Sequence, residues 1–268
     1  MNDESQTDSL AGVTKVSEMR SIAQIDLAEF DAVDVLVTEK LDGTSVRVGF
    51  TSGQAWCGGH NHILTVGEKH RYDGCGWGIY VSETGLIDKV TKHAEQRGAD
   101  FAIYGEFCGP KIQKNLYGLD ATEIFVFDMR SQGKWLPWEE VVELSALMGL
   151  RTVPVEQLGG HLDHAQLEDY FRSVSKLNPE LARREGIVIK ALDESMRFND
   201  GKRMIAKYRH EEERRAKPKK EISEKEKLLR SVGSVAREYM TLGRVKKAIS
   251  HLREENSAID FKLSLIHI

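Results

Sequence analysis

A lysine stands in the stretch VTEKLDGTSVRV, residues 37–48, where an apolar alternating run meets the turn-forming pair Asp42-Gly43. Asp-Gly between two such runs is typical of a β-hairpin, so one interpretation of Lys40 is a solvated charge beside a tight turn. The other interpretation is that Lys40 is a nucleophile. An ordinary lysine side chain has a pKa of about 10.4, and other cations, partial desolvation or a metal ion must lower it. The second interpretation therefore requires acidic metal ligands and further cations elsewhere in the chain.

Candidates for both groups stand at the ends of predicted strands. Glu106 closes the apolar run FAIYGEF, and Glu185 immediately precedes GIVIK, which ends in Lys190. Lys207 and Arg209 are two residues apart in a strand-like run, so they project from one face and repel each other unless an anion lies between them. A triphosphate is such an anion. Each charge alone is also explained by the ordinary occurrence of charged residues at strand ends and edges; the set together favours a nucleotide site.

Both strands and helices are predicted to position these residues. Alternating apolar, β-branched and aromatic residues predict strands at 33–37, 46–50, 101–107, 124–129, 186–192 and 204–209. Helices are predicted within 82–98, which closes at Gly98, and within 137–149, which Pro137 and Gly149 delimit. Strands with irregularly inserted helices predict an α+β fold of antiparallel sheets with flanking helices.

Several common nucleotide and metal motifs are missing from the sequence. No GxxxxGK[ST] and no GxGxxG occurs, so a glycine cradle at a helix N-terminus is not predicted. Cys57, His60, His62, His70 and Cys75 have a spacing that matches no common zinc pattern, and we interpret them as loop residues. The three cysteines include no CxxC pair, which indicates a reduced, cytoplasmic protein. No apolar run reaches the roughly 18 residues of a membrane span.

Charge divides the chain unevenly. The whole chain has a net charge of −4, whereas residues 201–253 contain 17 Lys or Arg against 7 Asp or Glu, a net of +10. This asymmetry predicts either a polyanion-binding segment or solvated helices with i,i+4 ion pairs. We predict a disordered leader at 1–20, one α+β domain at 21–212, and a small all-helical basic domain at 213–268.

Five motifs occur in an order that resembles a known superfamily. They are KLDG at 40–43, YGEF at 104–107, FVFD at 125–128, EGIVIK at 185–190 and AKYR at 206–209. The set resembles motifs I, III, IIIa, IV and V of the covalent nucleotidyltransferases, which comprise ATP-dependent DNA and RNA ligases and mRNA capping enzymes. The stretch GEFCGPKIQKN at 105–115 is most similar to the RNA ligase 2 type, the phage and editing-ligase branch.

The resemblance implies a nucleotidyltransferase (ATP-grasp-like) domain and a role for each matching residue. Lys40 would attack the α-phosphate of ATP and hold AMP as a phosphoramidate, with Mg²⁺ or Mn²⁺ held by Glu185. Asp42 and Gly43 would shape the loop that presents the lysine. The remaining residues would contact the nucleotide: Glu39 and Ser45 flanking its pocket, Glu106 on the ribose, Phe127 stacked on adenine, and Lys190, Lys207 and Arg209 on the phosphates.

Two positions depart from the superfamily pattern. Its fifth motif usually reads Lys-x-Lys, whereas the second cation here is Arg209, whose planar fork differs from an ammonium. An arginine commonly follows the second strand, whereas this chain has His60, which is largely neutral at pH 7. Arg209 would keep the positive charge of the motif, whereas His60 would not supply the charge that the arginine carries.

The segment after the fifth motif separates the branches of the superfamily. DNA ligases and capping enzymes of this kind continue into an OB barrel, whereas the residues after Arg209 have a helical pattern. The resemblance thus implies a monomeric RNA ligase of RNA repair that seals 3′-hydroxyl and 5′-phosphate ends, nicked or bridged, with the basic segment gripping the RNA. The alternatives are a minimal DNA ligase acting on nicks and a non-catalytic nucleic-acid binder.

Overall fold

The computed structural model describes residues 19–180 and 184–209. The chain divides into two compact units, Met1–His210 and Glu211–Ile268, and every described residue belongs to the first. The predicted helical domain at 213–268 lies outside the described residues. So does the predicted leader, except for Met19 and Arg20, and Arg20 already belongs to a short strand.

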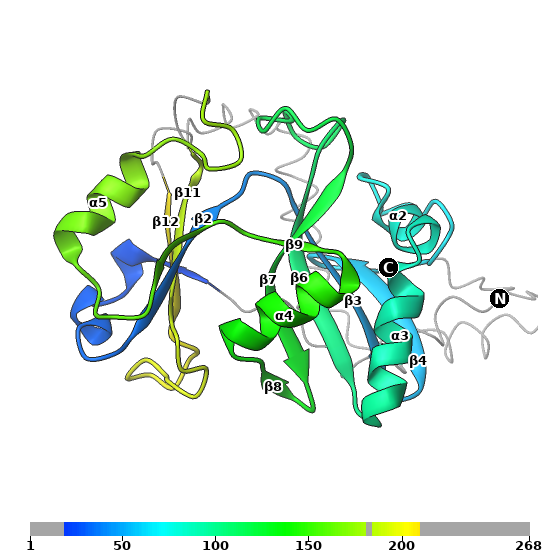
Figure 1. Ribbon diagram of the computed structural model, residues 1–268, viewed down its shortest axis with the longest axis horizontal. Helices are drawn as coiled ribbons and strands as arrows, with labels where there is room; N and C mark the ends of the chain where they lie inside the picture. The colour runs from blue at the N-terminus through cyan, green and yellow to red at the C-terminus, as the bar shows by residue number, and fades with distance from the viewer. Residues whose placement is uncertain (1–18, 181–183, 210–268) are drawn as a thin grey trace, which may run out of the picture. The chain divides into compact units, whose positions relative to one another are not determined.

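Two β-sheets form the framework of the described residues (Figure 1). The first sheet has the order β1-β12-β11-β2-β10, formed by Arg20–Ser21, Ile205–Arg209, Gly186–Ala191, Val35–Lys40 and Val155–Leu158. The second sheet has the order β5-β4-β3-β6-β7-β8, formed by Ile63–Leu64, Gln54–Gly59, Thr44–Thr51, Phe101–Cys108, Glu123–Ser131 and Lys134–Trp135. A further strand, β9 (Arg151–Thr152), pairs in parallel with β7.

Helices pack on these sheets rather than on one another alone. Contacts join the second sheet to α2 (Trp77–Glu83), α3 (Leu86–Arg97) and α4 (Trp138–Met148). In the first sheet, α5 (His164–Arg172) contacts β11, and two 3-10 helices, η1 (Ile22–Gln24) and η2 (Leu27–Phe30), precede β2. None of the helices in the described residues has the length and apolar character that crossing a bilayer requires.

The strands of the first sheet bury one face in a core and leave the other for the site. Val35, Val37, Ile187 and Ile189 share a buried cluster with Phe171 of α5. Because side chains alternate along a strand, the intervening residues of β2 and β11 point to the opposite face. That face carries the functional lysines, so burying one side of these strands fixes the direction of the other.

The α+β class is confirmed, and the predicted strands and helices are all present with ends that differ by at most four residues. The sheets are mainly antiparallel, with the parallel pairs β1–β12 and β7–β9 as exceptions. The sequence patterns did not predict α2, α5, β4 or β10. Helix α2 begins after Gly76, in a segment whose spacing matches no glycine motif, and Asp73 accepts hydrogen bonds from the backbone nitrogens of Trp77 and Gly78.

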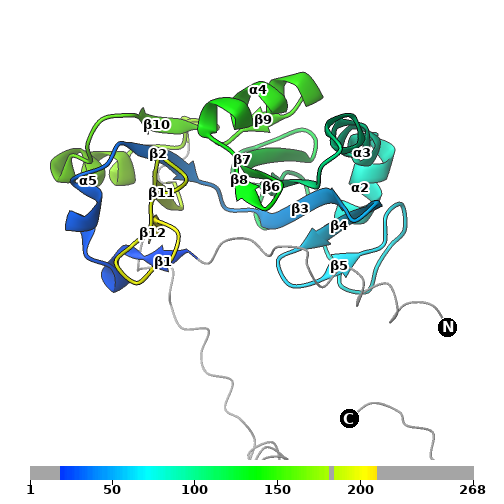
Figure 2. The same cartoon turned by 90° about the horizontal axis from the view of Figure 1, so that it is seen from below.

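The interpretation of Asp42-Gly43 as a hairpin turn, one of the two considered, is wrong. Strand β2 pairs with β10 and β11, whereas β3 pairs with β4 and β6, so the KLDG turn joins two different sheets. Figure 2 shows β2 leading from the first sheet directly into β3 of the second. A true two-residue hairpin follows at Ser52-Gly53, where both residues have positive φ. Lys40 therefore ends its strand at the junction of the sheets, not at a solvent-exposed hairpin.

Candidate active site

Three residues form one row across the first sheet. Gly186 of β11 pairs with Lys40 of β2 on one side and with Arg209 of β12 on the other. A Cβ atom at Gly186 would lie 2.0 Å from the carbonyl oxygen of Tyr208, so the row has no room for a side chain in the middle. Backbone packing thus explains the glycine of EGIVIK and brings the two cations to the same end of the sheet.

Lys40 is paired with a carboxylate rather than solvated. Its Nζ donates to Glu185 Oε2 at 2.5 Å, and the two side chains are only 18% and 16% exposed. Nη1 of Arg209 lies 3.9 Å from the other oxygen of Glu185. Burial raises the pKa of Glu185, and the charge of Lys40 opposes this rise. The interpretation of Lys40 as a solvated charge beside a turn is therefore wrong.

The loop after Lys40 is held in place through its backbone. The backbone nitrogen of Asp42 donates to Tyr117 Oη at 2.5 Å, and Gln113 Nε2 donates to the carbonyl oxygen of Gly43 at 3.2 Å. A Cβ atom at Gly43 would lie 2.6 Å from the carbonyl oxygen of Phe107, which explains the glycine. These contacts fix the direction in which the strand delivers Lys40.

The segment that supplies Gln113 is itself strained. Lys111, Gln113 and Asn115 have positive φ values of 67°, 46° and 45°, although none of them is glycine. Such conformations cost of the order of 1–3 kcal/mol each and cluster at functional sites. The sequence patterns did not predict this strain, although asparagine is one of the residue types enriched in the left-handed region.

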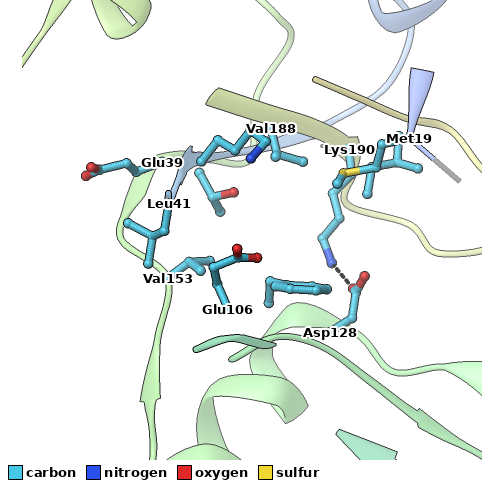
Figure 3. Close-up of a pocket in the computed structure, with 12 residues that line it drawn as sticks. Met19, Glu39, Leu41, Glu106, Asp128, Val153, Val188 and Lys190 are labelled. Carbon is cyan, nitrogen blue, oxygen red and sulfur yellow. Dashed lines mark hydrogen bonds and ion pairs between the residues drawn. The ribbon is translucent and has the colours of Figure 1, made fainter. Parts of the chain in front are cut away.

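A small pocket of about 50 Å³ opens beside Lys40 (Figure 3). Five of the sequence-predicted residues line it, namely Glu39, Lys40, Glu106, Phe127 and Lys190, together with Met19, Thr38, Leu41, Asp128, Val153, Val188 and Ile205. Ligand pockets usually measure about 300–1,000 Å³. A nucleotide therefore needs the lining side chains to move apart before it can enter.

Glu106 faces the pocket from β6 of the second sheet. It pairs with Ser45 of β3, whose Oγ is buried without a hydrogen-bond partner. Burial raises the pKa of Glu106 to about 8; Lys40 opposes this rise and Glu185 adds to it. The side chain is thus largely protonated at neutral pH and can both donate and accept a hydrogen bond. An orphaned hydroxyl beside it indicates that a polar group is to be bound here.

Phe127 reaches the pocket because of a β-bulge. Strand β6 pairs Tyr104 with Asp128 and Gly105 with Val126, so Phe127 is the extra residue on β7. A bulge re-aims the side chains around it and is frequent next to active sites. Phe125, two residues earlier, is fully buried, whereas Phe127 is half-buried and lines the pocket. Strict alternation would place both side chains on one face of the strand, and the bulge separates them; the stacking of Phe127 on a base stays a prediction.

Three predicted residues lie away from the centre of the pocket. The carboxylate of Glu39 points away from the other labelled side chains in Figure 3 and accepts from the backbone nitrogen of Lys176 at 2.9 Å. His60 lines a second hollow of about 350 Å³ together with Thr44, Lys111 and Gln113. Lys207 shares a strand face with Ile205, which lines the pocket, but is not itself among the lining residues.

Sequence reasoning missed an ionic cluster at the far end of the pocket. It joins Asp128 of β7 to Lys190 of β11 and to Glu194 and Arg203 of the connection between β11 and β12; we call these four residues the Asp128 cluster. Burial alone would raise the pKa of Asp128, but Arg203 and Lys190 outweigh it and lower this pKa. The motif FVFD was a sequence signal for Asp128. No motif or periodic pattern pointed to Glu194 or Arg203, because both lie in the irregular connection between β11 and β12.

The described residues offer no built-in metal centre. No group of three His, Cys, Asp or Glu side chains within 19–180 and 184–209 is placed to hold an ion. All three cysteines are free, and burial raises the pKa of Cys57 to about 12 and that of Cys75 to about 11, so both stay protonated at neutral pH. The interpretation as loop residues is wrong for Cys57, which is buried in strand β4, whereas His60, His62, His70 and Cys75 lie outside the helices and strands.

Comparisons with known proteins agree with this arrangement. A Naegleria gruberi RNA ligase mutant with ATP and Mn is 23% identical, with a TM-score of 0.58 over 74% of this chain and 56% of that chain. The same ligase with PPi is 24% identical, with a TM-score of 0.57 and the same coverage. This chain thus spans little more than half of those ligases, and at such identities the likeness shows the fold alone.

No curated protein matches the chain. The family model for RNA ligase, however, matches residues 33–209, which include all five motifs and every strand of both sheets except β1. This match covers well over half of the chain, and the chain therefore belongs to the RNA ligase family.

Proposed function

We propose that this protein is an ATP-dependent RNA ligase that joins a 3′-hydroxyl to a 5′-phosphate through a lysyl-AMP intermediate. The observation that supports this most is the Lys40–Glu185 pair, set at the junction of two sheets beside Glu106 and Phe127. Adenylate transfer to a lysine needs an amine and an aromatic ring in one pocket, here Lys40 and Phe127, and a carboxylate bonded to that amine, here Glu185.

In the first step the Lys40 amine attacks the α-phosphorus of ATP. A nitrogen–phosphorus bond forms, the bond to the bridging oxygen breaks, and pyrophosphate leaves. Glu185 Oε2, which lies 2.5 Å from Nζ, is placed to take the proton that Lys40 must lose. Lys207 and Arg209 share the face of β12 that continues the row from Lys40 and would bind the phosphates.

The pocket side chains would hold the adenosine part. Phe127 would stack on adenine, and protonated Glu106, with the unpartnered hydroxyl of Ser45, would hydrogen-bond the ribose. Asp42 and Gly43 keep the loop in position through their backbone contacts. Because its carboxylate points elsewhere, Glu39 would meet the nucleotide only through its backbone.

A divalent ion, Mg²⁺ or Mn²⁺, fits the oxygen donors at this end of the pocket. Glu185 supplies a carboxylate, and Mg²⁺ in nucleotide enzymes is commonly held by one or two carboxylates together with substrate phosphates. The absence of a three-residue metal group among the described residues agrees with a site that is completed by the substrate. When bound, the ion would neutralise charge on the phosphates.

In the later steps the adenylate passes to a 5′-phosphate of RNA, and a 3′-hydroxyl then displaces AMP. The hollow lined by Thr44, which follows KLDG, and by His60, Lys111 and Gln113 would offer a space for such an end. The basic segment 201–253 would grip the RNA backbone, since 17 Lys or Arg within it face only 7 acidic residues.

The direct test is adenylation of the intact chain. Incubation with ATP and a divalent ion should add one AMP to the mass of the wild-type protein and none to Lys40→Ala. Lys134→Ala, an exposed lysine of β8, is the matched control and should be adenylated normally. Loss of adduct in the control, or its retention in Lys40→Ala, would refute the assignment of the nucleophile. Nicked duplexes with RNA or DNA on the 3′-hydroxyl side then separate RNA sealing from DNA sealing.

A further inference from the structure

Arg203 satisfies every carboxylate oxygen of the Asp128 cluster. Its Nη1 and Nη2 donate to the two oxygens of Asp128 at 2.7 and 2.8 Å. Its Nη2 and Nε donate to the two oxygens of Glu194 at 2.7 and 2.9 Å. One guanidinium thus makes two bidentate pairs, one with each carboxylate, and bidentate pairs are among the strongest hydrogen-bonded ion pairs.

Lys190 bonds no carboxylate oxygen that Arg203 does not already bond. Its Nζ donates to Asp128 Oδ1 at 2.8 Å and to Glu194 Oε1 at 3.0 Å, and Nη2 of Arg203 already bonds both of these atoms. If Lys190 turned away, each carboxylate oxygen would keep a donor. If Arg203 were removed, one oxygen on each side would lose its donor in a place where the side chains are at most 10% exposed.

Lys190 also lines the pocket, so it has somewhere to turn. In Figure 3 its side chain and Asp128 meet at the end of the pocket next to Met19. Lys190 is well separated from Lys40. Lys40 pairs with Gly186, which lies four residues before Lys190 on β11. At about 3.4 Å per residue, this places Lys190 roughly 13 Å along the sheet from the nucleophile.

We propose that Arg203 is a positioning residue that holds Asp128 and Glu194 so that Lys190 can leave them and donate to the bound nucleotide. This inference rests on the proposed function. Lys190 lies far along the sheet from Lys40, and its partner Asp128 directly follows Phe127. The contact of Lys190 therefore falls at the adenosine end of the nucleotide rather than at the reacting phosphorus. Lys190 therefore contributes to ATP affinity and not to the rate of the chemical step.

The test is the ATP dependence of Lys40 adenylation in the full chain. Lys190→Met should raise the half-saturating ATP concentration about tenfold, as expected for one hydrogen bond to a charged donor, and leave the maximal rate within about threefold. Arg203→Lys cannot reach all four oxygens, so it should keep Lys190 in the cluster and raise half-saturation as well. Arg197→Lys, in the same connection but bonded to backbone carbonyls, is the matched control and should change neither.

The double variant Lys190→Met/Arg203→Lys decides whether the two residues act together. If Arg203 acts through Lys190, the double variant should show the half-saturation of Lys190→Met alone, with no further increase. Full additivity, an unchanged half-saturation in Lys190→Met, or a fall in its maximal rate would each overturn the inference. So would failure of Lys190→Met to fold, because Arg203 should satisfy the carboxylates without it. Absence of adduct in the wild-type protein would instead remove the proposed function, and this inference with it.

Discussion

The Lys40–Glu185 pair and the Asp128 cluster use the same chemistry in opposite ways. Lys40 has one close carboxylate, and the pair lies within the first sheet, with both side chains partly exposed. The Asp128 cluster links the two sheets, and its side chains are at most 10% exposed. A single partner leaves the lysine amine able to change protonation and to bond elsewhere. Several shared partners instead fix the distance between two sheets.

The same comparison explains the different positions of the two lysines. Lys40 ends its strand, where the backbone turns toward the second sheet, whereas Lys190 lies within β11 opposite a strand of that sheet. Reactivity requires access to substrate, and stability requires burial with full hydrogen bonding. The two regions meet at Phe127, which precedes Asp128 and lines the pocket with Lys40.

The largest expected effect comes from breaking the Asp128 cluster. Asp128→Asn removes a buried charge that faces two cations, and we expect it to destabilise the protein by about 3–5 kcal/mol. The measurement is the free energy of unfolding in urea. Arg172→Met, which breaks the exposed i,i+4 pair with Glu168, should leave the free energy of unfolding nearly unchanged, because solvent screens an exposed ion pair. Equal losses in the two variants would show that the cluster is not a structural link.

The next largest effect concerns the other region. Glu185→Gln keeps the shape of the side chain but removes its charge and its capacity to take a proton from Lys40. We expect adenylation to slow by about 100-fold, or about 2.7 kcal/mol in activation free energy, with little change in unfolding. Single-turnover formation of the AMP adduct measures it. Normal adduct formation together with a large loss of stability would show that the Lys40–Glu185 pair stabilises the fold, as the Asp128 cluster does, and is not needed for adenylation.

Substitutions of Phe127, which lines the pocket together with Lys40 and Asp128, test its role in binding ATP. Phe127→Ala should weaken ATP binding by about 1–3 kcal/mol, the usual worth of an aromatic stack on a base, while Phe127→Tyr should bind nearly as the wild type does. Calorimetric titration of the Lys40→Ala background with ATP gives the affinity without turnover. Weak binding in both variants would indicate that the bulge matters for packing and not for stacking.

Stability should also depend on pH. In the folded protein the pKa of Glu106 is raised from 4.5 to about 8, so the folded state binds a proton that the unfolded state has released between these values. Stability should therefore fall as pH rises from about 5 to 8 and level off above. Glu106→Gln, measured without nucleotide or metal, should flatten this part of the profile. A profile identical to that of the wild type would mean that Glu106 is already ionised.

The strands and long helices were predictable because their signals are local. Alternation located β3, β6 and β11, and Gly98 and Gly149 close α3 and α4 as expected. The alternative of a hairpin at Asp42-Gly43 stayed open in the sequence, because a two-residue turn looks the same whether its strands pair with each other or with others. Only the long-range pairing of β2 with β11 decides between these.

The sequence by itself determined the kinds of chemistry available: a strand-end lysine, carboxylates before or after strands, and cations two apart, in an order typical of one superfamily. The tertiary structure alone decided which of them meet. It paired Lys40 with Glu185, turned Glu39 away, re-aimed Phe127 by a bulge, and recruited Arg203 from an irregular connection. The reason is physical: side-chain type is a property of the chain, whereas burial, register and the sharing of hydrogen-bond partners exist only once distant segments pack together.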